Sequence, residues 1–450
     1  MIDDLRSQLK ALEEWGELLR IPREVDPRFE LSAISKKLEA AQALFFEKVR
    51  GNAMPIVVGT DNSRSRLARV LGTDDSSLLG RYLEAIRDPL SPVEVKDGPV
   101  KEVKLLGSVD LYRQIPVIHH YEKDGGPFIT SGIVIAEDPR RGIRNISYHR
   151  LQVLGQDEIG FYLQPRHLWN LYVAKEKEGK SLGVAIVIGL DCALRLAGAT
   201  WGFSIPFGFD ELSIAGALRK KPVEIVPCEK VEVKVPAKAE IVIEGEILPG
   251  VRKPQGPLTD FTGTYGDAWE GPIMKVTAIT HRQDAIYQDL LPCTPEHHLL
   301  LAVPSEPVVF QAIQDHFPRT KAVHITPSAC GRFHLVLSIK KEHEGDGKDA
   351  ILSGLSLSRD IKLVIVVDED VDPYNLREVE RAVATRVQAD RDLVVVSGAK
   401  GNPLDPSCLQ PGLTAKMGFD ATKPLSRKER FENAKIPGIE TVHIRDYLKG

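Results

Sequence analysis

The sequence predicts an α/β protein with a strand-rich central part, and three observations lead to this fold class. The chain has 450 residues, which at ~150 residues per domain gives about three domains. Its hydrophobic fraction of 42% and charged fraction of 27% are typical of globular proteins with sizeable cores. Helices alternate with strands near both ends, whereas strands dominate from about residue 100 to residue 291. We therefore expect two α/β parts around a central barrel or sandwich.

The N-terminal part, residues 1–98, begins with a predicted amphipathic helix. Its apolar face recurs at three- and four-residue steps and consists of Leu5, Leu9, Leu12, Trp15 and Leu19. A short apolar strand is expected at 54–59 and a second helix at 77–87. Pro, Asp and Ser at 87–92 interrupt the pattern and are typical of a domain boundary.

The central part, residues 99–300, contains predicted strands separated by Gly, Pro and charged turns. The apolar runs lie at 133–136, 146–154, 184–190, 223–226, 231–235 and 239–248. Two further runs, 274–280 and 285–291, are predicted to form a hairpin. Helices are expected at 167–175 and at 210–219, the second with Asp210 as its N-cap.

The C-terminal part, residues 301–450, returns to alternating helices and strands. A strand at 363–367, a helix at 378–387 and a strand at 393–396 predict a parallel βαβ unit. From Pro411 onward the sequence is polar and rich in lysine, so we expect a tail that packs on the surface or on a partner subunit.

Charge, cysteine content and the length of apolar runs argue against several classes of protein. Lys and Arg total 59 against 63 Asp and Glu, and the net charge of −4 argues against a nucleic-acid partner. The five cysteines form no CxxC pair, which excludes a zinc ribbon and favours reduced thiols. The N-terminus lacks a secretory pattern, and the longest apolar stretch, 182–190, is well short of the ~20 residues that span a bilayer. We expect a cytoplasmic protein that binds no membrane.

No generic catalytic motif occurs, so candidate sites are sought among polar residues in apolar surroundings. Residues 145–150 are predicted as one strand, with Asn145, Ser147 and His149 on one face and Arg150 on the other. An exposed edge strand with a polar face would carry the same pattern. The strand is therefore a candidate, and its sequence leaves both interpretations open.

Three residues could supply nitrogen and oxygen ligands to a divalent ion: Asn145, His167 at a helix start, and Glu211 in a first helical turn. Such a donor set suits Mn²⁺ or Mg²⁺ holding a phosphate better than it suits a structural zinc site. Spacing alone does not show that the three converge. A helix cap at His167 and a partner for the helix dipole at Glu211 are simpler interpretations.

A loop rich in Gly, Pro and Thr, residues 254–266, carries a single carboxylate, Asp260, next to Phe261. An acid held on a rigid loop beside apolar groups can donate or accept a proton. The same loop could be a plain connection in which Asp260 caps a turn. Asp260 is the candidate proton donor.

Taken together, seven segments of the chain resemble the UbiD family of reversible, non-oxidative decarboxylases, which use prenylated FMN. The resemblance is carried by residues 145–150, 165–167, 209–218, 236–245, 256–266, 384–386 and 416–423. It implies an N-terminal α/β region (1–98), a central split β-barrel of flavin-reductase type that holds the cofactor (99–300), and a C-terminal α/β domain with an oligomerisation tail (301–450). It also implies a homo-oligomer, a dimer or a hexamer.

The resemblance assigns a metal and cofactor site. Asn145, His167 and Glu211 fall on positions that bind a divalent metal, typically Mn²⁺, which bridges to the flavin phosphate, and K⁺ usually sits nearby. A metal neutralises a phosphate compactly. The other positions that the resemblance gives to the cofactor are Ser147, Tyr148, Arg166, Trp201, Gly202, Phe203 and Arg377.

The resemblance also assigns the catalytic residues. Arg150 falls on the family's catalytic arginine and Asp260 on its catalytic acid. The family usually has a second carboxylate five residues before that acid, where this chain has Gln255. Because a neutral amide cannot pair ionically with Arg150, either Asp260 alone balances the arginine or another acid substitutes. By position, the substrate pocket includes Leu163, Phe261 and His298, although His298 could equally cap a turn.

The implied reaction is covalent. The prenylated flavin adds to an unsaturated carbon next to the carboxylate and acts as the electron sink for loss of CO₂, and Asp260 then protonates that carbon. The substrate would be an aromatic, heteroaromatic or α,β-unsaturated acid, and a flavin prenyltransferase would supply the cofactor. One alternative is a trans-anhydromevalonate phosphate decarboxylase of isoprenoid synthesis, with Arg332, Lys340 and Lys341 as candidate phosphate ligands. Another is a flavin-binding subunit of a multi-subunit carboxylase.

Overall fold

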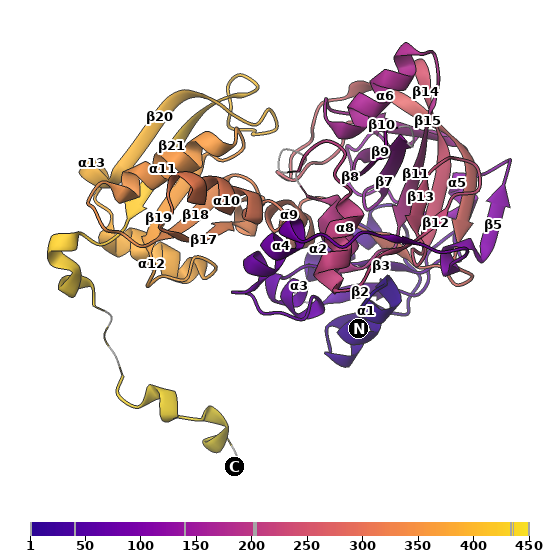
Figure 1. Ribbon diagram of the computed structural model, residues 1–450. Coiled ribbons are helices and arrows are strands. Elements are labelled where there is room, and N and C mark those ends of the chain that lie inside the picture. The colour runs from indigo at the N-terminus through magenta and orange to yellow at the C-terminus, as the bar shows by residue number, and fades with distance from the viewer. Residues whose placement is uncertain are drawn as a thin grey trace.

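A computed structural model describes residues 2–39, 42–138, 141–200, 205–432, 434 and 436–448. The N-terminal and central parts lie together, the C-terminal sheet and its helices form a separate lobe, and the final segment extends away from that lobe (Figure 1). The predicted fold class, α/β at both ends with a strand-rich centre, is confirmed. In the described part of the chain, no helix combines the length and apolar character needed to cross a membrane.

The N-terminal part surrounds a small sheet. Its elements are α1 (Leu5–Glu14), β1 (Leu18–Ile21), α2 (Glu30–Leu38), β2 (Ala43–Phe46), β3 (Ile56–Val58), α3 (Arg64–Val70) and α4 (Leu78–Arg87). Asp4 starts α1 by accepting a hydrogen bond from the Ser7 backbone N–H at 2.8 Å. The helix ends at Trp15 because Gly16, with φ +71°, turns the chain. The predicted helical position of Leu19 is therefore wrong, since Leu19 lies in β1.

The fourth strand of this sheet comes from far along the sequence. The strand order is β1-β2-β3-β16, and β16 (Tyr287–Asp289) pairs in parallel with β3. The predicted hairpin of 274–280 with 285–291 is therefore wrong. The first of these runs belongs to β15 (Trp269–His281), which pairs with β14 (Ile241–Gln255). An alternating pattern identifies a strand but not its partner, which is why the hairpin prediction failed.

The central part is a nine-stranded antiparallel sheet. Besides β14 and β15 it contains β5 (Val103–Leu106), β6 (Phe128–Ile129), β7 (Ile133–Asp138), β8 (Ile143–Tyr148), β9 (Arg150–Val153), β10 (Glu158–Tyr162) and β11 (Leu182–Ile188). Its helices are α5 (Leu111–Gln114), α6 (His167–Lys177), α7 (Cys192–Gly198) and α8 (Glu211–Arg219). A smaller sheet joins β4 (Val93–Glu94), β12 (Glu224–Pro227) and β13 (Lys234–Pro236), and η1 (Pro99–Lys101) precedes β5.

The connection between β8 and β9 shows that this sheet curls. The strand order is β6-β9-β10-β15-β14-β11-β7-β8, so β8 and β9 lie six strand spacings apart, about 29 Å in a flat sheet. Only His149 separates them in sequence, and that link spans at most about 7 Å. The two ends of the sheet must therefore approach each other, as in a split barrel. The prediction of a single strand over 145–150 is wrong for the same reason, because the chain changes strand at His149.

The C-terminal part is a five-stranded sheet in the order β17-β18-β19-β21-β20. Its elements are α9 (Pro295–Ala302), α10 (Glu306–His316), β17 (Thr320–Ile325), η2 (Pro327–Ala329), β18 (His334–Ile339), α11 (Asp346–Leu357), β19 (Leu363–Asp368), α12 (Leu376–Arg386), α13 (Ala389–Asp392), β20 (Leu393–Lys400) and β21 (Leu413–Ala421). The turns η3 (Leu425–Phe431), η4 (Ile439–Thr441) and η5 (Ile444–Asp446) follow.

Two predictions for this part are wrong. The predicted parallel βαβ unit of β19, α12 and β20 does not form, because β20 runs antiparallel at the edge of the sheet; an apolar strand pattern does not tell strand direction, and the parallel βαβ unit here is β18-α11-β19. The expected tail from Pro411 begins too early, because β21 lies between β19 and β20. Lys416, which made this segment look solvent-exposed, is buried and donates to the carbonyls of Leu355 and Ser358 at 2.9 and 2.7 Å.

A buried ionic cluster joins the three parts beneath the candidate site. Arg195 of α7 donates to Asp61 of the N-terminal part at 2.5 Å and to Glu296 of α9 at 2.6 Å. All three side chains are at most 1% exposed. Removing one partner of a buried pair leaves an uncompensated charge, so the cluster holds its members firmly in place. It thereby fixes α9, which carries His297 and His298, against the central sheet.

Candidate active site

Arg150 and Asp260 form an ion pair at the centre of the candidate site. Arg150 is the first residue of β9, and its guanidinium donates to Asp260 Oδ2. The Phe261 backbone N–H donates to the other carboxylate oxygen at 2.7 Å. The Arg150 side chain is 21% exposed and that of Asp260 9%, so both are reachable yet largely withdrawn from water. The structure thus brings together the two residues predicted to be catalytic.

Gln255 does not take part in this ion pair. Its side chain lies at the end of β14, where its amide N–H donates to the Pro272 carbonyl at 3.1 Å. Its amide oxygen accepts from the Trp269 indole N–H at 3.0 Å. Among the described residues, Asp260 is the one carboxylate that pairs with Arg150. Of the two arrangements left open by the sequence, the geometry matches the one in which Asp260 alone balances the arginine.

Two of the three predicted metal ligands lie in contact. Glu211 starts α8 behind its N-cap Asp210, as predicted, and its carboxylate accepts from the Ile146 backbone N–H at 3.1 Å and from Asn145 Nδ2 at 3.4 Å. Burial raises the pKa of Glu211 to about 8. A buried carboxylate with no cation among its described partners fits a divalent ion, and the Asn145 amide, whose oxygen accepts from Ser147, offers a second oxygen donor nearby. The residues present therefore fit the implied metal.

His167 and Arg166 open α6 on the neighbouring face. Arg166 is the N-cap, and the imidazole of His167 lies edge-on to Phe207 with ring centroids 5.3 Å apart. Burial, assisted by the charge of Arg166, lowers the pKa of His167, which favours the neutral form that binds metals. Its described contacts include neither Asn145 nor Glu211, so its role as third ligand stays a prediction. Within the described residues, no three His, Cys, Asp or Glu side chains are grouped so that they could hold a metal ion by themselves.

The remaining predicted cofactor positions divide into four groups. Ser147 donates to Asn145 Oδ1 at 3.1 Å and so belongs to the metal-ligand face. Tyr148 alternates to the opposite face of β8, where it packs with the core and burial raises its pKa to about 12. Arg377 is exposed on α12, and its described contacts include no other candidate residue. Trp201, Gly202 and Phe203 lie outside the described residues.

Two of the three predicted substrate-pocket residues, Phe261 and His298, lie beside Asp260. Phe261 follows it directly, and the imidazole Nε2 of His298 lies 2.8 Å from the Phe261 carbonyl. Leu163 is half-buried and packs against the main core near the end of β10. The described hydrogen-bond partner of the His298 imidazole is the Phe261 carbonyl. His298 therefore supports the loop that carries Asp260 and Phe261.

His297, which the sequence interpretation did not select, lies nearer the ion pair. Burial lowers its pKa to about 3, and the charges of Asp260, Arg332 and Arg150 also act on that pKa. The buried imidazole of His297 is therefore neutral and lies within electrostatic reach of both arginines. Two adjacent histidines at a helix start were a visible signal, but their spacing does not tell which one faces the site. Tyr162 and Trp269 were also missed, because aromatic residues in strands usually belong to a core.

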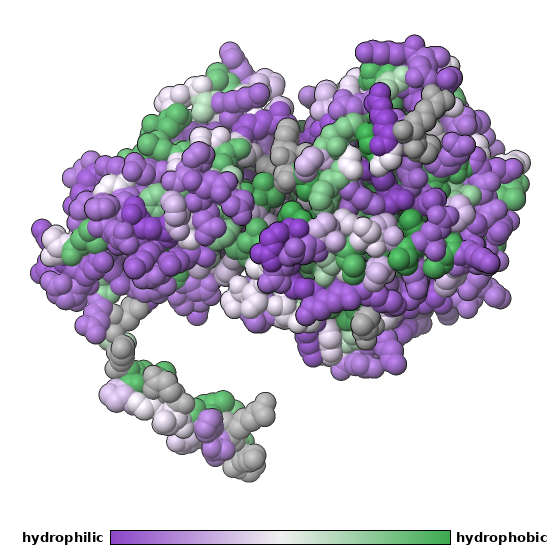
Figure 2. Space-filling model, viewed as in Figure 1, coloured by the Kyte–Doolittle hydropathy of each residue, from purple (hydrophilic) through white to green (hydrophobic). Residues whose placement is uncertain are grey.

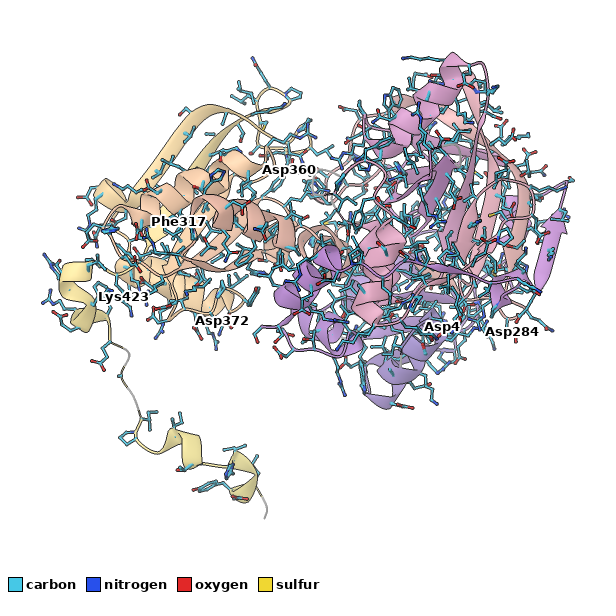
Figure 3. The ribbon with its side chains drawn as sticks, viewed as in Figure 1. Asp4, Asp284, Phe317, Asp360, Asp372 and Lys423 are labelled. Carbon is cyan, nitrogen blue, oxygen red and sulfur yellow. The ribbon has the colours of Figure 1, made fainter. Side chains whose placement is uncertain are left out.

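One of three basic residues considered for phosphate binding reaches this region. The guanidinium of Arg332 lies 5.4 Å from the ring centroid of Phe261 and pairs with Asp360 at 2.8 Å. Asp360 lies on the side of the C-terminal lobe that faces the central sheet (Figure 3). Burial and the charge of Arg332 lower the pKa of Arg166. The two arginines therefore lie close enough for their charges to interact. Lys340 and Lys341 instead pair with Glu342 and Glu344 elsewhere.

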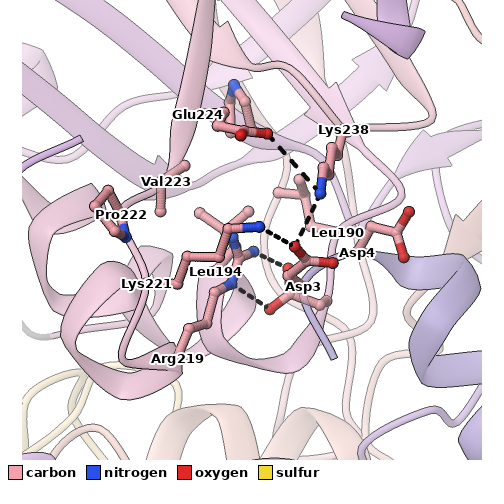
Figure 4. A pocket seen from close by; sticks show the side chains of 12 residues that line it. Asp3, Asp4, Leu190, Leu194, Arg219, Lys221, Pro222, Val223, Glu224 and Lys238 are labelled. Carbon is pink, nitrogen blue, oxygen red and sulfur yellow. Dashed lines mark hydrogen bonds and ion pairs between the residues drawn. The ribbon is translucent and has the colours of Figure 1, made fainter. Parts of the chain in front are cut away.

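A polar pocket on the other side of the molecule is filled by its own ion pairs. Asp3 accepts from Lys221 and Lys238 at 2.8 Å each, and Arg219 pairs with Asp191 (Figure 4). The cavity among them measures about 10 Å³, roughly the space of one water molecule. These pairs fasten the chain start to α8, and the pocket is too small for a substrate.

His149 makes the stability of the site sensitive to acid. Burial lowers its pKa to about 4 from an ordinary value of 6.5, so the folded protein holds it neutral. The unfolded chain binds the proton first as the pH falls, and stability present above pH 6.5 is lost towards pH 4. We expect a loss of about 3 kcal/mol over this window, by 1.36 kcal/mol per pKa unit.

Urea unfolding at pH 7 and at pH 4.5 measures this loss. The variant His149→Gln is expected to reduce the difference between the two pH values, whereas His316→Gln, on an exposed helix end, should leave it unchanged. An equal pH dependence in His149→Gln and the unmodified protein would contradict the assignment.

Comparison with known proteins shows a match along almost the entire chain. Three family models of 3-octaprenyl-4-hydroxybenzoate carboxy-lyase match it: the N-terminal domain at 9–86, the Rift-related domain at 91–295 and the C-terminal domain at 298–421. The anhydromevalonate phosphate decarboxylase of Methanothermobacter thermautotrophicus is 37% identical over 423 residues, which cover 92% of this chain and 96% of that protein.

Solved structures agree with the sequence match. The UbiD-class enzyme HmfF from Pelotomaculum thermopropionicum in complex with FMN has a TM-score of 0.95 and 43% identity, covering 99% of this chain and 100% of that one. An evolved dimeric form of HmfF, in complex with prFMN, has a TM-score of 0.91 and 40% identity over 99% and 100% of the two chains. The 3,4-dihydroxybenzoic acid decarboxylase of Enterobacter cloacae reaches 0.93 and 32% identity, over 99% of each chain. With the family models, these relatives and the fold in agreement, the chain belongs to the UbiD family of carboxy-lyases and is a decarboxylase of that class.

Proposed function

We propose that this chain is a reversible, non-oxidative decarboxylase of an aromatic, heteroaromatic or α,β-unsaturated carboxylic acid, with prenylated FMN as cofactor. The observation that supports this most directly is the largely buried ion pair of Arg150 and Asp260 beside Phe261. A guanidinium suits a substrate carboxylate, because its planar donors match both oxygens. Asp260 suits the proton that the carbon must receive when CO₂ leaves.

The cofactor part of the proposal rests on the metal-ligand face and on the relatives. Asn145 and Glu211 would hold a divalent ion, typically Mn²⁺, with His167 as third ligand, and that ion would neutralise the flavin phosphate. K⁺ would bind nearby. The HmfF structures contain FMN or prFMN, which supports a flavin here. When bound, prenylated flavin supplies the electron sink for loss of CO₂.

The chain's own residues would then work in sequence. Arg150 takes the substrate carboxylate and, in doing so, loosens its pair with Asp260. Asp260 is freed to carry a proton and deliver it to the carbon that has lost CO₂. Phe261 and Leu163 exclude water from one side of the pocket, which strengthens each electrostatic contact inside it. In the carboxylation direction Asp260 receives the proton instead.

Co-expression with a flavin prenyltransferase, followed by a CO₂-release assay on a panel of acids, tests the proposal. Turnover of at least one unsaturated acid by flavin-loaded protein is the expected result. No turnover on any acid, with oxidised flavin bound, would contradict it and favour a flavin-binding subunit of a larger carboxylase. Mass photometry on the same sample would measure the expected homo-oligomer.

Exposed apolar side chains support self-association. In the view of Figure 2 they lie along the segment that leads away from the C-terminal lobe. The segment carries Ile436, Ile439, Val442, Ile444 and Leu448, all at least half exposed in the isolated chain. Apolar groups left in water in this number are typical of an interaction surface.

A second candidate is an acid that carries another anionic group, such as anhydromevalonate phosphate. Arg332 and Arg166 support it, because Arg332 lies 5.4 Å from the ring centroid of Phe261, next to Asp260, and its charge also acts on the pKa of Arg166. A relative with that activity is 37% identical. A charged hydrogen bond contributes about 1.5–3 kcal/mol.

The variant Arg332→Met should therefore raise KM about 10–100-fold for an acid with a second carboxylate or phosphate. KM for a monoanionic acid should change less than about threefold. Lys340→Met, on the exposed surface, serves as the control. Equal KM changes for both kinds of acid would contradict recognition of a second anion by Arg332.

A further inference from the structure

Besides pairing with Asp260, Arg150 lies against two aromatic rings. Its guanidinium carbon lies 4.4 Å from the ring centroid of Tyr162 and 5.8 Å from that of Trp269. Tyr162 is the direct cross-strand neighbour of Arg150 in the β9–β10 pair. The two rings meet edge to face, with centroids 4.9 Å apart and an interplanar angle of 71°. A guanidinium in this position is attracted by the negative faces of both rings.

Trp269 is held in turn by Gln255. The two residues are direct cross-strand partners in β14 and β15, and the indole N–H donates to the amide oxygen at 3.0 Å. The amide N–H of Gln255 donates to the Pro272 carbonyl at 3.1 Å. The amide therefore cannot rotate without losing a hydrogen bond. Gln255 is 2% exposed, which makes an unpaired amide costly.

Three glycines shape the space around this pair. A Cβ on Gly160 would lie 2.4 Å from the Gln255 side-chain carbon Cδ, and one on Gly256 would lie 2.4 Å from the Trp269 ring. A Cβ on Gly271 would lie 2.7 Å from the Gln255 amide nitrogen and 2.9 Å from the indole nitrogen. Any side chain at these positions would displace the amide or the indole. The backbone is thus fitted to this one arrangement.

We propose that Trp269, oriented by Gln255, is a positioning residue that holds the Arg150 guanidinium in place for the substrate carboxylate. The proposal rests on the decarboxylase function above. Gln255 thereby acts through Trp269, without a described contact to Arg150, and neutral aromatic rings flank the guanidinium that pairs with Asp260. Because the rings carry no net charge, they fix the orientation of Arg150 without competing with the substrate as a second carboxylate would.

Kinetics of three flavin-loaded variants test this role. Trp269→Leu removes the ring and is expected to raise KM for the carboxylic acid about 3–30-fold, the equivalent of a cation–π contact, with kcat within about threefold. Trp269→Phe keeps a ring and should stay within about threefold of the unmodified KM. Trp169→Leu, a half-buried tryptophan on α6 that packs against Tyr172, is the matched control and should leave KM unchanged.

A purely structural role would give a different result. It would lower the melting temperature and the flavin content of Trp269→Leu and leave the KM of the folded, loaded fraction unchanged, which would overturn the proposal. Equal KM increases in Trp269→Leu and Trp169→Leu would overturn it as well.

Crystal structures of the flavin-free variants separate this proposal from the proposed function. In Trp269→Leu the Arg150 guanidinium should leave its place over Tyr162, and in Gln255→Met the indole should rotate and Arg150 should shift with it. In Trp269→Phe Arg150 should stay. If Arg150 is unmoved in Trp269→Leu, the positioning role fails, whether or not any acid is turned over.

Discussion

Replacing Asp260 with Asn is expected to lower kcat for CO₂ release by about 10²–10⁴-fold while the flavin stays bound. The amide keeps the size of the carboxyl group, and its oxygen can still accept from the Phe261 backbone N–H, which lies 2.7 Å away. It cannot carry the proton that the reacting carbon requires. The measurement is CO₂ release at saturating substrate, with flavin content read from the absorbance spectrum of the same sample.

The same loop offers a matched control. Asp267 is exposed and belongs to no described ion pair, so Asp267→Asn should retain kcat within about twofold. Full activity in Asp260→Asn would remove Asp260 from the role of acid. Loss of flavin from Asp260→Asn would also contradict this interpretation, because the inactivity would then come from an empty site.

The second large effect is expected at Glu211. Glu211→Gln should weaken Mn²⁺ binding by at least about 100-fold, since replacing even a group that supports a metal ligand typically weakens metal binding 10–100-fold. Flavin should be lost together with the metal, because under the proposed function the metal would neutralise the flavin phosphate. The glutamine oxygen can still accept from the Ile146 backbone N–H, at 3.1 Å from the present carboxylate. The metal-free variant should therefore melt within about 2 °C of the metal-free unmodified protein.

Isothermal titration with Mn²⁺ and metal analysis of the purified protein measure this effect. Glu232→Gln, an exposed substitution in the same part of the chain, is the control and should bind Mn²⁺ normally. Unchanged metal and flavin content in Glu211→Gln would exclude Glu211 as a ligand. A much lower melting temperature would show instead that the carboxyl group supports the fold.

Most individual elements could be predicted from the sequence, whereas their partners could not. The α8 start at Asp210 followed from a local capping pattern, and the structure has it at that residue. The pairing of β16 with β3 could not be predicted, because the partners lie about 230 residues apart and periodicity carries no information on them. Lys416 misled for a different reason, since a lysine normally marks a solvated segment and here it is buried against two carbonyls.

In the candidate site, too, several residues could be predicted from the sequence, whereas most of their contacts could not. Residue type and resemblance selected Arg150, Asp260 and Glu211, and the structure brings Arg150 to Asp260 and Glu211 to Asn145. Trp269 could not be selected from the sequence, because its proposed role depends on the contact of its ring with the Arg150 guanidinium. That contact is set by the register of β14, β15 and β10. The choice between His297 and His298 depends on the rotation of α9, which the buried cluster around Arg195 sets from another part of the chain.

The one-residue link at His149 holds Asn145 and Arg150 close together through the chain itself, whereas their partners make completion of the active site a late event in folding. Glu211 lies 66 residues beyond Asn145 and Asp260 lies 110 residues beyond Arg150, so these distant segments must pack before the site is complete. Contacts between residues far apart in the sequence form slowly, because closing the loop between them costs conformational entropy before the contact stabilises the chain. A ligand that touches both β8 and β9 can bind only the closed sheet, and it stabilises that state by mass action. Cofactor supply would then regulate how long the protein survives in the cell, in addition to its activity.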